Sequence, residues 1–100
     1  MRFLVEKVFD IWEMRVHTDH DTPAPGCYDE YETSKKVLAT SSTMASAEWY
    51  RKRLIKKYLS QGWRDTINST KKQARLMDNG ASNEIYLWVA GRIVSEIPTR

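Results

Sequence analysis

The chain has 100 residues, 41% of them hydrophobic and 29% charged, with a formal net charge of +3 at pH 7. This length fits one domain, residues 1–100, and this composition excludes a wholly disordered chain. No apolar run approaches the ~20 residues that span a bilayer, no signal-peptide core is present, and the single cysteine favours a cytoplasmic location.

The first segment, residues 3–16, fits two structures. One face of a helix would carry five polar residues, which are Arg2, Glu6, Asp10, Glu13 and His17. However, residues 12–16 alternate, and Phe9 and Ile11 favour a strand. We predict a strand, because a lone hairpin elsewhere in the chain would need further strands to be stable. An amphipathic helix is the alternative.

A loop and a second strand are predicted next. Residues 17–30 contain two prolines, a glycine and four acids after His17, which is typical of a loop. Residues 31–40 follow as a strand with Val37 and Leu38 at its centre.

A helix is predicted from Thr43, a suitable N-cap, to Gln61, just before Gly62. At 100° per residue its apolar stripe is centred on Ala47, Tyr50, Leu54 and Tyr58 and widened by Met44, Ile55 and Leu59. Arg51 lies near this stripe, where it would reach toward solvent or pair with an acid across the sheet.

Two strands are predicted after the helix, at residues 71–77 and 84–97. The turn-forming residues 78–83 between them indicate a hairpin. Gly91 interrupts the second strand and is expected at a bulge. The predicted fold is therefore α+β in the order ββαββ, with a four-stranded antiparallel sheet and one amphipathic helix packed on one face.

Positive charge is concentrated in the middle of the chain. Residues 35–75 hold eleven basic and two acidic residues, a net charge of +9, whereas residues 1–34 carry −5 and residues 76–100 carry −1. On the polar face of the predicted helix, Trp49 lies among cations. We assign partner binding to Trp49, Lys52, Arg53, Lys56 and Lys57. The alternative is a solvated charged face on which Arg53 covers the Trp49 ring.

Two further surfaces are candidates. Lys71, Lys72 and Arg75 could contact nucleic acid, although alternation puts Lys72 on the other strand face, and these lysines could instead guard an edge strand. If Ile85, Leu87, Val89 and Ile93 pack on the helix, the opposite face carries Tyr86, Trp88 and Arg92 and lacks a helix to cover it. That face would form a homodimer or partner interface unless residues 17–30 or the first segment cover it.

No catalytic, cofactor or metal site is expected. His17, His20 and Cys27 carry metal-binding atoms, but their spacing matches no structural zinc pattern, and a Cys–His–Asp triad would lack a rigid support. The four glycines are too dispersed for a phosphate loop.

The sequence therefore favours a non-enzymatic protein-interaction module, such as an adaptor or inhibitor. Its partner would be a protein with an acidic or apolar surface, and the size and charge would suit a small viral effector. Direct nucleic-acid binding through the basic helix is the alternative. The acidic N-terminal third argues against this alternative unless it folds away from the basic face.

Overall fold

The computed structural model describes residues 5–19, 29–66, 73–80 and 82–95. They form β1 (Val5–Asp19), β2 (Asp29–Ser41), α1 (Met44–Ser60), β3 (Arg64–Asp65), β4 (Gln73–Met77) and β5 (Asn83–Ser95). All five strands belong to one antiparallel sheet in the order β2-β1-β5-β4-β3. The α+β class and the ββαββ order are confirmed, and the two-residue strand β3 is an addition to the four strands predicted.

Strand β1 is an interior strand of the sheet. It pairs with β2 along one side and with β5 along the other, which favours the extended form of residues 5–16 over the helical alternative. The pairing of β1 with β2 continues through Asp19. On the other side of β1, the backbone N–H of Thr18 donates a hydrogen bond to the carbonyl of Ser82 at 2.7 Å. The prediction of a loop from residue 17 was therefore wrong for residues 17–19 and 29–30. Loop-type residues there are held in strands by partners distant in the sequence.

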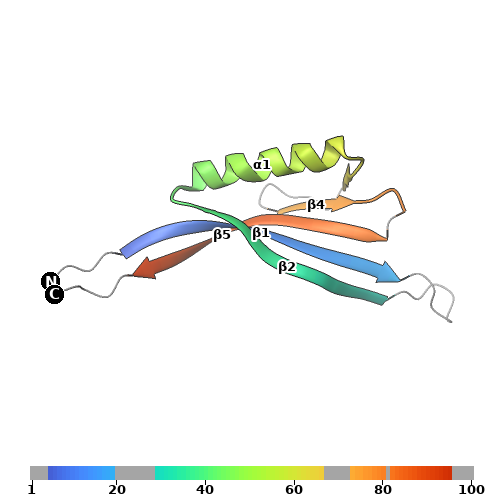
Figure 1. The fold of residues 1–100 in the computed structure, drawn as a ribbon, viewed down its shortest axis with the longest axis horizontal. Coiled ribbons are helices and arrows are strands. Elements are labelled where there is room, and N and C mark those ends of the chain that lie inside the picture. The colour runs from blue at the N-terminus through green and yellow to red at the C-terminus, as the bar shows by residue number, and fades with distance from the viewer. Residues whose placement is uncertain (1–4, 20–28, 67–72, 81, 96–100) are drawn as a thin grey trace.

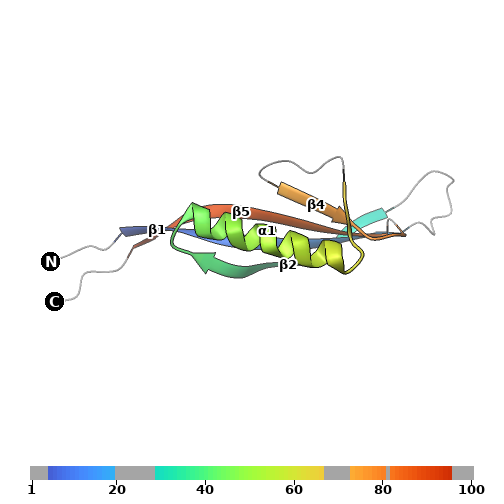
Figure 2. The ribbon, with the colours of Figure 1, turned by 90° about the horizontal axis from the view of Figure 1, so that it is seen from above.

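Helix α1 lies over one face of the sheet, above β1 and β5 (Figures 1 and 2). Thr43 is its N-cap, and its side chain accepts a hydrogen bond from the backbone N–H of Ser46 at 3.1 Å. At the other end Gly62 has a φ of 100°, a conformation that residues with a Cβ rarely adopt. Both helix boundaries agree with the prediction to within one residue.

The core lies between α1 and the sheet. It is built from the buried side chains of Ala74, Leu76, Ile85 and Leu87, against which Leu38, Leu54, Ile55, Tyr58 and Trp63 pack. The alternation predicted for the last strand is confirmed for Ile85 and Leu87, which are fully buried toward the helix, but Ile93, which was expected to pack on the helix as well, is 71% exposed. We call the sheet face that carries α1 the helix side and the opposite face the outer face. No described element lies over the outer face (Figure 1).

Three details differ from the expectations. Met44 and Leu59 are 47% and 40% exposed, so they do not widen the apolar stripe. Leu59 lies five residues after Leu54 and hence about 140° around the helix. Arg51 is buried instead of reaching toward solvent, and its Nη2 lies 2.8 Å from the carboxylate of Glu48 on its own helix.

The bulges are in β2 and not at Gly91. Register shifts occur between Ile11 and Trp12 and between Arg15 and Val16 where β1 pairs with β2, whereas the pairing of Phe9 with Gly91 is continuous. A Cβ at Gly91 would lie 3.0 Å from Cε of Lys7 and 3.5 Å from the Phe9 ring. This glycine therefore leaves space for the side chains of the neighbouring strand.

The molecule is elongated. Its Cα radius of gyration is 17.7 Å, whereas a compact chain of this length has about 13 Å. The paired ends of β1 and β5 extend past the start of α1 as a two-stranded ribbon (Figure 1). Within the described residues, no helix has the length and apolar character needed to cross a membrane.

Candidate functional site

Trp49 lies on the solvent-facing side of α1, where the sequence placed it. It is 58% exposed, the highest value of any described tryptophan. The guanidinium carbon of Arg53, one turn later, lies 4.7 Å from the centre of the Trp49 ring. This cation–π contact contributes about 0.5–1 kcal/mol at an exposed site, so it holds the indole in place but does not bury it.

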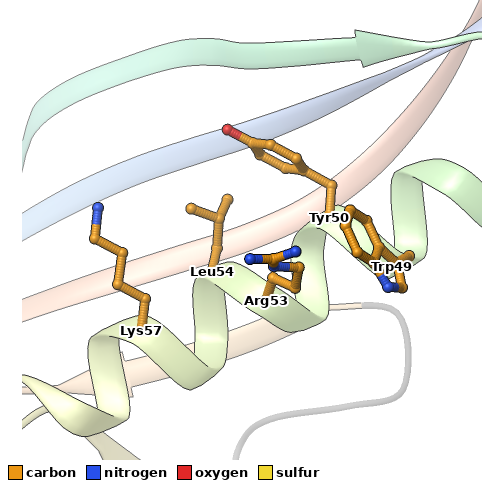
Figure 3. Close-up of a pocket in the computed structure, with 5 residues that line it drawn as sticks. All are labelled: Trp49, Tyr50, Arg53, Leu54 and Lys57. Carbon is orange, nitrogen blue, oxygen red and sulfur yellow. The ribbon is translucent and has the colours of Figure 1, made fainter.

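A shallow depression of about 510 Å³ adjoins Trp49. Its lining combines apolar and cationic side chains, which are Trp49, Tyr50, Arg53, Leu54 and Lys57. Figure 3 shows Tyr50, Leu54 and Lys57 projecting from the same side of the helix, with the guanidinium of Arg53 beside Trp49. The floor can accept an apolar group, and the two cations can contact an anion at its rim.

Charge is segregated between the two faces of the molecule. Helix α1 carries five cations and a single acid, Glu48. On the outer face, the register and the alternation of β1, β2, β4 and β5 place five acids (Glu6, Asp10, Glu30, Glu32 and Glu84) and three cations (Lys35, Arg75 and Arg92). Four of the eight acids in residues 1–34 thus lie on the face opposite the basic helix, whereas Glu13 and Asp19 lie on the helix side.

The outer face has an aromatic centre, of which the sequence placed Trp88 on this face but not Trp12. Trp12 and Trp88 are directly paired across β1 and β5, with ring centres 6.0 Å apart and planes 6° apart. Nζ of Lys35 on β2 lies over both rings, at 5.6 and 5.9 Å. Trp12 therefore belongs to the same face as Trp88 and does not cover it from above.

Two ion pairs flank this aromatic centre. Asp10 accepts hydrogen bonds from Nε of Arg92 at 2.7 Å and from the Thr40 hydroxyl at 2.6 Å, and the bond from Arg92 is the main reason that the pKa of Asp10 lies below its usual value. Arg92 remains accessible, with its side chain 56% exposed.

The second ion pair is formed by Arg75 and Glu84. Nε of Arg75 donates to the Glu84 carboxylate, which also accepts a hydrogen bond from the Tyr86 hydroxyl at 2.9 Å. The bond from Arg75 lowers the pKa of Glu84, whereas burial, followed by the bond to Glu84, raises the pKa of Tyr86 to about 12. Arg75 also lies 5.6 Å from the Tyr86 ring centre. It is thus already engaged by its own chain.

A third polar cluster lies on the helix side. Glu13, 2% exposed, accepts hydrogen bonds from Nε of Arg15 at 2.6 Å and from the Tyr58 hydroxyl at 3.1 Å. Burial, and secondly the Glu13 charge, raises the pKa of Tyr58, while the hydrogen bond to Glu13 raises the pKa of Arg15. This cluster joins helix to sheet, and its Arg15, with a side chain that is 44% exposed, also lines a depression of about 330 Å³ beside Trp63 and Asn83.

The remaining candidates are separated or lie outside the described residues. Lys71, Lys72, His20 and Cys27 are among the residues that the structure does not describe. Nδ1 of His17 lies 2.9 Å from Oδ1 of Asn83. Within the described residues, no three His, Cys, Asp or Glu side chains are close enough to hold a metal ion.

The chain matches no protein-family model, and neither a curated protein nor a solved structure is significantly similar to it.

Proposed function

We propose that the chain is a small protein-interaction module that binds an acidic surface of a partner protein through the exposed face of α1. The observation that carries this proposal is the exposure of Trp49 beside the depression, with Arg53 holding its ring. Exposed, pre-positioned tryptophans are frequent energetic centres of protein interfaces, because the ring buries a large area without losing much side-chain freedom.

The chemistry of the depression favours a protein as the partner. Leu54 and Tyr50 supply an apolar lining, and Arg53 and Lys57 supply positive charge beside it. In an acidic peptide segment, an apolar side chain would fill the apolar lining and a neighbouring carboxylate would pair with the two cations. A nucleic-acid backbone presents phosphates but no aliphatic group to fill the apolar part.

Nucleic-acid binding through the same helix is the second candidate, and the segregation of charge favours it. The acids of the N-terminal third would repel a polyanion only if they lay near α1, and four of the eight are on the outer face. The two candidates use the same cations. Protein binding also needs the apolar lining, whereas nucleic-acid binding does not need it and should depend more steeply on salt.

Affinity capture from the source cells tests the primary candidate. The baits are the wild type, Trp49→Ala, Lys56→Glu and two matched controls. Tyr31→Ala removes another exposed aromatic ring, and Lys7→Glu reverses an exposed cation outside α1. We expect one protein that is retained by the wild type and by both controls and is lost from Trp49→Ala and Lys56→Glu. Retention by all five baits would refute the role of the helix face.

The nucleic-acid candidate has its own test. Fluorescence anisotropy with labelled duplex DNA and labelled single-stranded RNA is measured at low and at physiological salt. Tight binding that falls steeply with salt and is abolished by Lys52→Glu, Arg53→Glu and Lys56→Glu together would replace the protein-binding proposal.

A further inference from the structure

The sheet has a free edge on the side to which the depression on α1 is directed. Strand β2 is the first in the order β2-β1-β5-β4-β3, so no described strand pairs with its second edge. Helix α1 contacts β2 as well as β1 and β5, and Leu38 of β2 packs against the same core as Leu54 of α1. Figure 3 shows Tyr50 and Leu54 pointing from α1 toward β1 and β2. The apolar lining of the depression therefore faces the side of the sheet that ends at β2.

Cations from both elements border this region. Lys36 of β2 is paired with Glu13, to which the Tyr58 hydroxyl of α1 donates, so Lys36 lies on the helix side. Lys57, next to Tyr58 in the helix, lines the depression. Both lysines are exposed, and neither forms an ion pair with an acid of the described part of the chain. Their charges are therefore open to an acidic group of a partner.

An extended segment would fit the strand edge and the helix together. Its backbone can exchange hydrogen bonds with the free edge of β2, and its alternate side chains would point to the helix side. Alternate residues of a strand are about 6.6 Å apart. Tyr50 and Leu54, four residues apart in α1, are separated by about 6 Å along the helix axis. Figure 2 shows this axis running along the sheet, so alternate side chains of the segment would keep step with the helix.

The free edge of β2 restricts which strand can be added. The pairing of β2 with β1 shifts register on both sides of residues 34–37, so the regular stretch is short. Residues 34–41 include Lys35 and Lys36 and no acid. Bulges and lysines disfavour pairing with the same edge of another copy, whose lysines would repel these. A short segment that carries acids avoids both obstacles.

We infer that the partner binds through a short extended segment, which adds a strand to the free edge of β2 and lays alternate side chains against α1. This inference rests on the proposed function and specifies the conformation and side-chain pattern of the partner. Apolar residues of the segment contact Tyr50 and Leu54. An acidic residue on the same face of the segment pairs with Lys36 and Lys57, and Trp49 borders the segment at the rim of the depression.

A model peptide tests this inference by fluorescence anisotropy with the full chain at physiological salt. The labelled probe has nine residues, with threonine at every odd position, valine at the two central even positions and glutamate at the two outer ones. When it is extended, its valines and glutamates share one face, and the pattern is the same in both directions. The control peptide has the same composition, with the glutamates moved to the opposite face.

The probe should bind with a sub-millimolar dissociation constant, and the control peptide should bind about fivefold more weakly or not at all. The difference is expected because only the probe can place an apolar group and an acid on the helix side together. Absence of probe binding at about 1 mM, or equal binding of the two peptides, would overturn the inference.

Lys36 and Lys35 provide matched charge reversals. They are consecutive in β2 and both exposed, but Lys35 lies on the outer face, opposite Met14. Either change alters the net charge equally, so a difference between them reports the position of the acid. Lys36→Glu should weaken probe binding about fivefold, and Lys35→Glu should leave it within about twofold. Equal effects would overturn the inference. If circular dichroism shows that Lys36→Glu is unfolded, Lys57→Glu takes its place.

Backbone methylation of the probe tests strand addition directly. Two versions carry N-methyl groups on the odd or on the even residues, and each therefore lacks the amide donors of one edge. One version should bind like the probe and the other should lose binding, because only one edge of the segment meets β2. Equal affinities of the two versions would overturn strand addition. If capture by Trp49→Ala is nevertheless lost, the helix face remains the binding site and only the extended segment is rejected.

Discussion

The hydroxyl group of Tyr58 on α1 donates a hydrogen bond to Oε2 of Glu13 on β1, with 3.1 Å between the two oxygens. Glu13 is almost fully buried, and its other oxygen accepts a hydrogen bond from Arg15. A buried carboxylate must be solvated by the protein itself, so this bond both satisfies Glu13 and fixes where the helix lies on the sheet.

Replacing Tyr58 with Phe should therefore lower the free energy of unfolding by about 1–3 kcal/mol, because Oε2 of Glu13 loses its donor. Urea unfolding measures the change. Tyr31→Phe is the control, since Tyr31 is half exposed, and its effect should stay within about 0.5 kcal/mol. Equal effects of the two changes would contradict the structural role of the Tyr58–Glu13 bond.

Tyr86 should give the protein a stability that is lost at high pH. Its pKa is raised from 10.0 to about 12 in the folded chain, so the folded state holds the phenolic proton more tightly than the unfolded state. The stabilisation is complete below pH 10 and disappears as the pH rises to about 12. Tyrosinate absorbance during alkaline titration should show a late-titrating group that is missing from Tyr86→Phe.

Glu84 should contribute the opposite dependence in acid. Its folded pKa is lowered, chiefly by the hydrogen bond from Arg75, from a usual value of 4.5. Its stabilisation is present above pH 4.5 and is lost as the pH falls through the folded pKa. We expect Glu84→Gln to be less stable at pH 7 by about 1–3 kcal/mol. Thermal unfolding at a series of acidic pH values should show that the stability of Glu84→Gln changes less with pH than the stability of the wild type. An equal change in both proteins would refute this assignment.

Two glycines should respond differently to alanine. Gly62 has a positive φ after the end of α1, and Gly62→Ala should cost about 1 kcal/mol of stability. Gly91 has ordinary strand geometry, and a Cβ there would be closest to the flexible end of Lys7. Gly91→Ala should therefore change stability less than Gly62→Ala. Thermal unfolding of both variants makes the comparison, and the reverse order would contradict it.

The elements that were predicted correctly have local signals. Thr43 and Gly62 bound the helix, and the turn residues 78–83 join two alternating segments, so neighbouring residues alone specify these features. The position of Trp49 on the exposed helix face also follows from helical periodicity. These are the parts for which interactions within about ten residues determine the conformation.

Alternation within one segment placed Tyr86, Trp88 and Arg92 on the outer face, but the positions of Trp12 and Lys35 could not be predicted, because they depend on registers between distant strands. Nothing near Trp12 in the sequence indicates that it pairs with Trp88, or that Lys35 lies over both rings. A shift of one residue would move Trp12 to the other face. The bulges of β2 and the two-residue strand β3 likewise have no distinctive local pattern.

The role of the exposed helix face is the central claim, and Trp49→Ala tests it most directly. The wild type and the variant are compared in two measurements: the free energy of unfolding in urea, and titration calorimetry with the protein that the wild type captures. We predict that stability changes by no more than about 1 kcal/mol, because the ring is 58% exposed and mainly contacts Arg53. Binding should weaken by about 2 kcal/mol or more. Unchanged affinity for that protein would contradict the account.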